Sequence, residues 1–353
     1  MAGRKTYRKV ITNPELTKQI CSENIKLMER YLKNFATKRS PKSVIVYRSN
    51  LIIFFTWNLL YNDNKVFTEI RKVEMLDFFD YVLDELKWSS NRYAQAHSSL
   101  SSFSDWIENY LDDYDEYKNF RNIVKKIEKP PKETVRKKSV FSKEELDNLM
   151  NYLGEQGLIN EQCLLAVMMA SGARISELSR FKTTMIDENC TAFEGLFLET
   201  TEEMQVKGRG VNGKYITRYL IKDLFLPYYK KWLPIREKIM KENNKEHDYI
   251  FIKKNGEPAN TSTFRFWIEK WDKVLNKHLY AHSIRHFWTT YLLSVGLEKE
   301  FVQELQDWSS DTLVSLYNDA TAKDRKWKNL DKLKSALNQD KNEIKLENND
   351  STD

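Results

Sequence analysis

One short segment divides this chain into two parts that are expected to fold separately. Lys129-Pro130-Pro131-Lys132 interrupts the helical spacing of apolar residues that runs on both sides of it. Proline fixes φ and lacks a backbone N–H, so two in succession favour an extended backbone and end a helix. The 353 residues are enough for two ordinary domains, each with its own core. We therefore predict two units joined by a linker.

The part before the break has the pattern of a small all-helical bundle. Ser40 is placed to cap a helix that has Pro41 at its first position. Apolar residues recur at helix spacing in four stretches. The inward faces are predicted to be Ile25, Met28, Leu32 and Phe35; Val44, Tyr47, Leu51, Phe54 and Phe55; Val73, Leu76, Phe79, Tyr81 and Val82; and Tyr93, Ala96, Leu100, Phe103 and Ile107.

The part after the break is predicted to be mainly α with a small three-stranded antiparallel sheet. Ser142 and Glu145 have the spacing of a capping box at a helix start, and Gly172 is placed to end a later helix. Between residues 194 and 222 the pattern changes to three short strands, 196–198, 204–206 and 215–221, around a glycine-rich turn. Helices are predicted within 146–153, 158–170, 226–240, 263–275, 282–295 and 299–305.

These patterns give a domain plan. Residues 1–19 form a basic N-terminal extension, 20–115 a helical domain, 116–141 a basic linker and 142–336 the second domain. Residues 337–353 are polar and are expected to be disordered.

The positive charge of the chain is concentrated in the linker. The formal net charge is +6, and the segment from Arg121 to Lys138 holds eight basic and two acidic residues, so 8 − 2 = +6 as well. Such a segment can neutralise several phosphates. A solvated linker explains the charge equally well.

Cysteine usage and the N-terminus bear on the compartment. Cys21, Cys163 and Cys190 are far apart and odd in number, which favours a reducing compartment. The first residues lack the apolar segment of a signal peptide, and no apolar run approaches the ~20 residues of a bilayer span. We expect a cytoplasmic protein.

Five residues in the second part have the chemistry to cut a phosphodiester. Cutting without a metal needs fixed cations on the non-bridging oxygens, an in-line nucleophile and an acid for the leaving oxygen. Arginines bind phosphate bidentately, and a histidine three residues before an arginine shares its helix face. A tyrosine with a pKa of ~10 needs activation by positive charge. The candidates are Arg174, Lys207, His282, Arg285 and Tyr317.

Taken singly, each of these residues is more often structural, and the joint pattern carries the argument. Lys214 lies on the other side of the hairpin that carries Lys207 and is an alternative catalytic lysine. No His, Cys or acidic residues stand at metal-ligand spacing, so we predict no metal and no cofactor.

The order of these motifs resembles the tyrosine recombinase (phage integrase) family. The shared features are Arg-x-x-Glu-Leu from Arg174, Lys-Gly at Lys207, His-x-x-Arg from His282, and a final Tyr317. Trp308 stands nine residues before Tyr317 (317 − 308 = 9), where many members have the histidine of Leu-Gly-His. The resemblance is to the simple two-domain, Cre/Xer-like type. It implies a SAM-like core-binding domain followed by a catalytic domain.

The resemblance also implies a function. The protein would be a site-specific DNA recombinase that forms a 3′-phosphotyrosyl intermediate at Tyr317 and exchanges strands through a Holliday junction, without ATP. Its partner would be double-stranded DNA with short inverted repeats, bound by a homotetramer on two sites, with a monomer or weak dimer in free solution. An accessory directionality protein is a further possible partner, and a helix after Trp327 would pack in cis or on a neighbouring protomer. By this resemblance the catalytic residues are Arg174, Lys207, His282, Arg285, Trp308 and Tyr317, with Glu177 orienting Arg174, and the DNA contacts are Lys38, Arg39, Lys42, Lys125, Lys126, Lys129, Arg136, Lys137 and Lys138.

Several roles stay open within this chemistry. The composition, rich in Lys and Asn, suits integration or excision of a mobile element or phage. A Xer-like dimer resolvase, a type IB topoisomerase-like enzyme and a catalytically silent DNA-binding protein are the alternatives.

Overall fold

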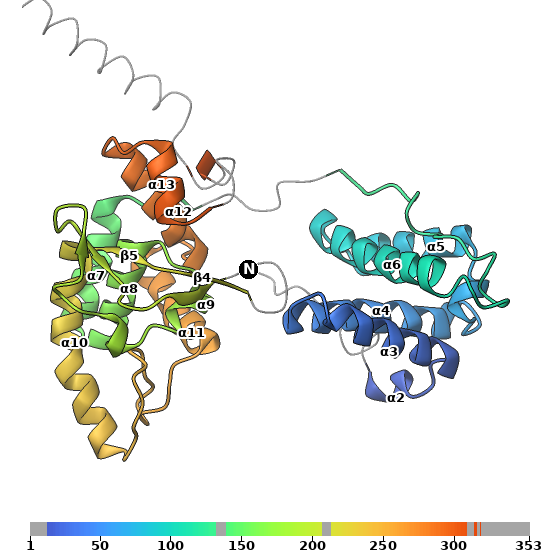
Figure 1. The fold of residues 1–353 in the computed structure, drawn as a ribbon, viewed down its shortest axis with the longest axis horizontal. Helices are drawn as coiled ribbons and strands as arrows, with labels where there is room; N and C mark the ends of the chain where they lie inside the picture. The colour runs from blue at the N-terminus through green and yellow to red at the C-terminus, as the bar shows by residue number, and fades with distance from the viewer. Residues whose placement is uncertain (1–12, 132–138, 207–212, 309–313, 316–317, 319–353) are drawn as a thin grey trace, which may run out of the picture. The chain divides into compact units, whose positions relative to one another are not determined.

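The chain forms two compact units, and the division between them falls between Lys137 and Lys138, inside the predicted linker (Figure 1). The computed structural model describes residues 13–131, 139–206, 213–308, 314–315 and 318. Most of the predicted N-terminal extension and the whole predicted tail lie outside these residues, as do Arg136, Lys137 and Lys138.

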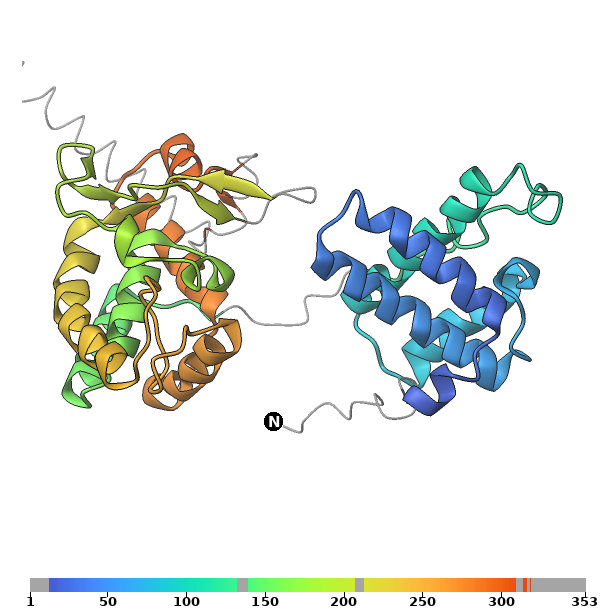
Figure 2. The same cartoon turned by 60° about the horizontal axis from the view of Figure 1, so that its bottom comes forward.

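The first unit is built from helices joined by turns and loops from residue 13 to residue 131, as predicted. Helices α3, α4 and α6 pack against one another, and α5 packs on α6 (Figure 2). The elements are α2 (Pro14–Thr17), α3 (Ser22–Ala36), α4 (Pro41–Tyr61), the 3₁₀ helix η1 (Phe67–Glu69), α5 (Lys72–Asp84) and α6 (Ser90–Tyr110).

Helix α4 begins where the sequence predicted and forms the centre of this unit. The Ser40 side chain accepts a hydrogen bond from the Ser43 backbone N–H at 3.3 Å, and Pro41 occupies the first turn. Phe54 and Phe55 are fully buried, and each meets the Phe67 ring edge-on. By length and composition alone α4 is apolar enough to cross a membrane, but 44% of its most apolar window is buried. Packing in the core accounts for that composition.

One predicted inward face is partly wrong. Val73 and Leu76 on α5 are exposed, whereas Met75 and Phe78 are fully buried. Phe79 and Val82 lie inward as predicted. The helix is rotated relative to the prediction, because the large aromatic ring of Phe78 packs edge-on against Phe54 and Trp57 in the core.

The first half of the predicted linker belongs to the core of the first unit. Tyr117, Phe120, Val124 and Ile127 are all buried in the same apolar cluster as α3, α4 and α6. The Tyr93 hydroxyl donates to the Glu128 carbonyl oxygen at 3.0 Å. The lysines between these residues remain exposed, so the basic segment lies on the surface of a folded part.

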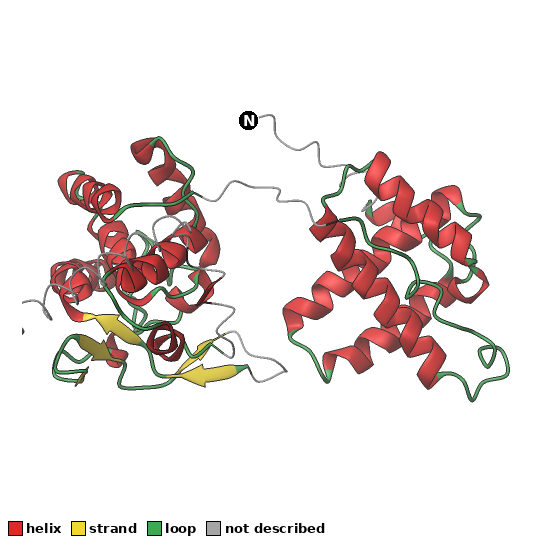
Figure 3. Cartoon of the chain, turned by 90° about the horizontal axis from the view of Figure 1, so that it is seen from above, coloured by secondary structure: helices red, strands yellow, loops and turns green. Residues whose placement is uncertain are grey.

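The second unit is mainly helical, with its strands gathered at one edge (Figure 3). Helix α8 is fully buried along nearly its whole length and packs against α7, α10 and α12. The elements are α7 (Lys143–Glu155), α8 (Ile159–Ser171), α9 (Ile175–Leu178), η2 (Thr183–Met185), β1 (Thr191–Ala192), β2 (Phe197–Glu199), β3 (Met204–Val206), β4 (Lys214–Ile216), β5 (Tyr219–Ile221), α10 (Lys222–Glu242), α11 (Thr261–Leu275), α12 (Ala281–Ser294) and α13 (Lys299–Leu305).

Two predicted helix boundaries of this unit are confirmed by their local hydrogen bonds. The Ser142 hydroxyl accepts from the Glu145 N–H at 3.1 Å, and a Glu145 carboxylate oxygen accepts from the Ser142 N–H at 2.8 Å. Gly172 ends α8 in the left-handed region, with φ +59°.

The sheet is small and antiparallel as predicted, but its strands are arranged differently. The three-stranded sheet has the order β1-β2-β5, and β3 pairs with β4 in a separate two-stranded sheet. The strand predicted over 215–221 is therefore two strands with a break at Thr217 and Arg218. The break lets the segment contribute to both sheets.

Candidate active site

Arg174 stands at the start of α9 and is held there by Glu177. The Arg174 backbone N–H and its Nη1 each donate to the Glu177 carboxylate at 2.9 Å. The Arg174 side chain is 24% exposed, whereas that of Glu177 is fully buried. The short helix thus presents one guanidinium to solvent with its inner edge fixed by a buried acid.

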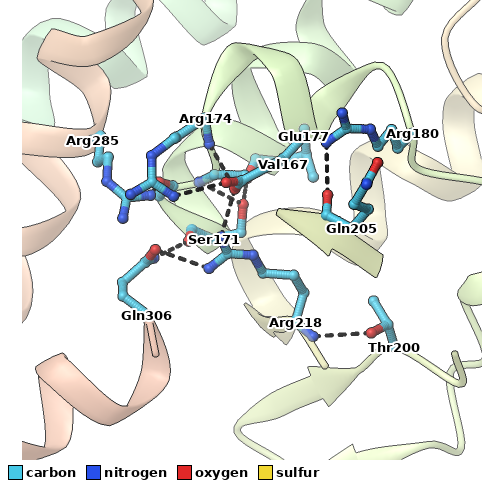
Figure 4. A network of polar contacts seen from close by, with 12 residues as sticks. Val167, Ser171, Arg174, Glu177, Arg180, Thr200, Gln205, Arg218, Arg285 and Gln306 are labelled. Atoms are coloured by element: carbon cyan, nitrogen blue, oxygen red, sulfur yellow. Dashed lines mark hydrogen bonds and ion pairs between the residues drawn. The ribbon is translucent and has the colours of Figure 1, made fainter. Parts of the chain in front are cut away.

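A second arginine, Arg218, completes the surroundings of this acid (Figure 4). Its Nη2 donates to Glu177 Oε2 at 2.5 Å, and it is itself buried. Burial alone raises the pKa of the Glu177 carboxyl, but the charges of Arg218 and Arg174 outweigh it and hold that pKa below its ordinary value. Glu177 is therefore an anion between two cations.

Gln306, just after α13, connects this ion group to the end of α8. Its Oε1 accepts from Arg218 Nη1 at 2.9 Å, and its Nε2 donates to the Ser171 carbonyl oxygen at 2.5 Å. The residue is 2% exposed. Figure 4 shows Arg218 between Gln306 and Glu177, with Ser171 beside them.

Arg285 comes to the same place from α12. Its Nη1 donates to the Gly172 carbonyl oxygen at 2.6 Å, two residues before Arg174. Its guanidinium lies 4.9 Å from the centre of the Trp308 ring, within the range of a cation–π contact. Among the described residues the structure thus brings Arg174, Arg285, Trp308 and Glu177 together. Arg174 and Arg218 both pair with the Glu177 carboxylate, and the charge of Arg285 also acts on it.

His282 lies one turn before Arg285 on the same helix. The ring is exposed, and its centroid is 5.9 Å from that of the buried His286. Both His282 and Arg285 lie on α12, three residues apart, which is the helical spacing that the His-x-x-Arg motif predicted.

Two of the predicted catalytic residues lie outside the described residues, and the choice between Lys207 and Lys214 as the catalytic lysine stays open. Lys207 and the predicted nucleophile Tyr317 are both in this group, so their places in the site remain predictions. Lys214 is exposed at the first position of β4.

The predicted DNA contacts of the first unit that lie among the described residues are at the surface. Lys38, Arg39 and Lys42 are exposed around the turn between α3 and α4, and so are Lys125, Lys126 and Lys129. Lys38 lies 5.6 Å from the centre of the exposed Tyr110 ring. The role of these side chains in DNA binding stays a prediction.

The Phage integrase family matches residues 139–324 of this chain, which is more than half of it. The match spans the unit that holds the arginine group. The chain belongs to the phage integrase family. As a member of it, the protein is a tyrosine recombinase, an enzyme that cuts and rejoins DNA.

Individual relatives are distant. The tyrosine recombinase XerC of Lacticaseibacillus casei (strain BL23) is 25% identical over 288 residues, covering 80% of this chain and 89% of the relative. The Tn1549 transposon integrase in complex with a circular intermediate DNA has a TM-score of 0.62 at 12% identity, over 88% of this chain and 99% of that one. A lambda integrase tetramer bound to a Holliday junction has a TM-score of 0.59 at 16% identity, over 83% and 76% of the two chains. These structural likenesses are of the fold.

Arg218 and Gln306 were absent from the site predicted for this recombinase. The sequence contained a signal for Arg218, because Ile216, Arg218 and Leu220 alternate onto one buried side of their segment. Gln306 stands where many members have leucine, and no role in the site was predicted for it. A polar side chain at an otherwise apolar position signals a buried hydrogen-bonding partner.

Gly172 is required at this site for two reasons that a substitution can separate. A Cβ there would lie 2.8 Å from Trp288 Cδ2 and 2.9 Å from Gln306 Nε2, and φ is +59°. Gly157 has a similar φ of +66° with nothing within 4 Å of its Cβ position. We expect Gly157→Ala to lower the free energy of unfolding by about 1–2 kcal/mol from backbone strain alone. Gly172→Ala should lose about 1–3 kcal/mol more from overpacking. Equal losses in urea unfolding would contradict the predicted clash.

The depressed pKa of Glu177 predicts how stability changes with pH. A carboxyl whose pKa is lower in the folded state stabilises above its unfolded pKa, and the stabilisation is lost as pH falls through the folded pKa. Glu177→Gln at pH 7 should therefore cost about 3 kcal/mol or more, because the buried Arg218 loses its counterion. The difference from the wild type should narrow below about pH 4.5. Urea unfolding from pH 7 to pH 3 checks this, with Glu155→Gln, an exposed acid of α7, as the control; a difference independent of pH would contradict it.

Proposed function

We propose that this tyrosine recombinase is a site-specific integrase that cuts DNA through a 3′-phosphotyrosyl bond at Tyr317. The observation that carries the proposal is the arginine group. Arg174 and Arg285 come from separate helices and meet at the Gly172–Arg174 turn, where Arg285 bonds the Gly172 carbonyl. Fixed cations of this kind stabilise the charge that develops on a phosphoryl group, without reorganisation during the reaction.

The proposed cleavage step follows from the chemistry of these groups. The Tyr317 oxygen attacks phosphorus in line, the bond from phosphorus to the 5′ oxygen breaks, and the 5′ strand leaves as a hydroxyl. Lys207, or Lys214 in its place, gives the leaving oxygen its proton, and His282 takes the phenol proton or passes it on. Arg174 and Arg285 hold the two non-bridging oxygens, with Trp308 packed on Arg285. A 5′ hydroxyl from a partner duplex reverses the step, so the bond energy is kept and no ATP is needed.

Strand exchange by this route needs four protomers on two DNA sites and a Holliday junction between them. The proposal is supported by the fold shared with lambda integrase, whose solved structure is a tetramer bound to a Holliday junction. We propose short inverted repeats as the target, with the exposed Lys38, Arg39 and Lys42 and the basic segment after Arg121 on the phosphates. Free protein is then a monomer or weak dimer in the cytoplasm, and an accessory directionality protein is a possible further partner.

Two biological roles compete within this proposal. Mobile-element integration is supported by the fold shared with the Tn1549 integrase, which aligns over 88% of this chain. Resolution of chromosome or plasmid dimers is supported by the XerC relatives, which align over 80% of it. We favour the mobile-element role, since the Lys- and Asn-rich composition suits it, and keep the dimer resolvase as the second candidate.

Covalent capture without metal tests the proposal and finds the target together. The protein is incubated with sheared genomic DNA from its source in EDTA and denatured in SDS, and the ends of the protein-linked fragments are sequenced. Ends that converge on an inverted repeat at the border of a mobile element support the integrase. Convergence on one chromosomal site supports the resolvase, scattered ends support a type IB topoisomerase-like activity, and the absence of any adduct would support a silent DNA-binding protein.

A further inference from the structure

We propose that Gln306 is a positioning residue that sets both phosphate-binding arginines from one buried amide. This inference rests on the proposed function, because it assigns the arginines of that site a common support. Gln306 belongs to none of the predicted motifs except as a departure from the leucine usual at its position.

The first link runs from Gln306 to Arg174. The Gln306 Oε1 accepts from Arg218 Nη1, Arg218 Nη2 donates to Glu177 Oε2, and Glu177 Oε1 accepts from Arg174 Nη1. Gln306, Arg218 and Glu177 are each at most 2% exposed. Water does not compete for these bonds, and each group has few alternative partners. The orientation of Arg174 therefore depends on where the amide holds Arg218.

The second link runs from Gln306 to Arg285. The Gln306 amide nitrogen donates to the Ser171 carbonyl, and the next carbonyl, that of Gly172, accepts from Arg285. Two residues after Gln306 the Trp308 ring lies against the Arg285 guanidinium. Asp307 between them has φ +49°, a left-handed conformation that Asp tolerates better than most residues. The Gln306 side chain thus anchors the turn at Ser171 and Gly172, whose carbonyl group binds Arg285. Its backbone begins the segment that carries Trp308.

A side-chain amide meets both requirements where a leucine would not. The amide oxygen accepts from the Arg218 guanidinium and the amide nitrogen donates to the Ser171 carbonyl. These two partners therefore fix the orientation of the amide group. The Gly172 Cβ position lies 2.9 Å from Gln306 Nε2, so the amide is packed as closely as a glycine permits. A leucine here would leave Arg218 and the Ser171 carbonyl each with one buried bond fewer.

The test compares Gln306→Met with a matched buried glutamine. Gln162 lies in the same unit, is 5% exposed and donates to the Met150 carbonyl at 2.9 Å, within α7 and α8 rather than at the arginines. Gln162→Met therefore removes a comparable bond. We measure the rate of covalent adduct formation on a nicked duplex of the mapped site at saturating protein, and the Kd for the same duplex.

For Gln306→Met we expect a rate about 10- to 100-fold lower, the size of effect seen when reacting groups are displaced by about 1 Å. Its Kd should change by less than about threefold, and Gln162→Met should keep the wild-type rate. Arg218→Met should be no less impaired, and adding Gln306→Met to it should change little, because the two act as one unit. Additive losses, or equal losses in the two glutamine variants, would overturn the proposal.

A second readout does not depend on cleavage. In protein labelled with ¹⁵N-arginine and free of DNA, Gln306→Met should shift or broaden the guanidinium Nε–H signals of both Arg174 and Arg285, while Gln162→Met leaves them in place. Signals unchanged by Gln306→Met would refute the positioning role even if the wild type cuts DNA. Shifted signals in a protein that forms no adduct would keep the positioning role and reject the proposed function.

Discussion

Tyr317→Phe is expected to abolish covalent cleavage while leaving DNA binding intact. The change removes one oxygen atom, and that oxygen is the proposed nucleophile, so no phosphotyrosyl bond can form. The aromatic ring is kept, and binding by the basic surfaces does not depend on the hydroxyl. We expect the rate of adduct formation to fall below detection and the Kd to stay within about twofold of the wild type.

The control for this variant is another tyrosine of the same unit. Tyr152 on α7 is 38% exposed and belongs to no part of the site, so Tyr152→Phe should cleave at the wild-type rate. Adducts measured on SDS gels with end-labelled DNA decide the matter. Cleavage retained by Tyr317→Phe would place the nucleophile on another residue and break the proposed mechanism.

Arg174→Ala is expected to lower the cleavage rate at saturating DNA by about 10²- to 10³-fold, the typical loss on removing one transition-state donor. Arg174 is the most exposed of the three grouped guanidinium groups, with 24% of its side chain accessible, so it is the one best placed to meet the phosphate directly. Charge on the non-bridging oxygens grows on the way to the transition state. Binding should therefore weaken much less than cleavage.

Arg174→Lys separates charge from geometry. A lysine keeps the positive charge but cannot bind phosphate and Glu177 together with a planar fork, so we expect it to recover less than a tenth of the lost rate. Single-turnover cleavage gives the rate and DNA titration gives the Kd, both on the same duplex. Equal losses in rate and affinity for Arg174→Ala would show that the residue only holds DNA.

The sequence could predict the elements that depend on neighbouring residues. The caps at Ser40 and Ser142 and the helix end at Gly172 were confirmed, because each is formed by bonds within a few residues. The inward face of α5 was partly wrong. The apolar spacing shows that α5 has a buried face. Which residues form that face was decided by the packing of Phe78 against Phe54 and Trp57.

The domain boundaries also depended on packing that the local sequence pattern does not show. The proline pair marked the end of the helical pattern, but residues up to Ile127 pack into the first core. Their apolar side chains alternate with basic residues, and the segment was assigned to the linker because of that charge and the proline pair that follows it. Likewise the strand over 215–221 was detected, and its division between two sheets depended on partners far along the chain.

The sequence by itself determined the family and the mainly helical fold, and it predicted the residues that would do the chemistry, because the motifs have recognisable residue types at recognisable spacing. Only the tertiary structure decided how Arg174 and Arg285 are supported. Gln306 lies 88 residues from Arg218 and 135 from Ser171, and no local pattern links positions so far apart. The physical reason is burial. Groups removed from water must satisfy their hydrogen bonds with whatever the fold brings to them, and that is a property of the packed chain.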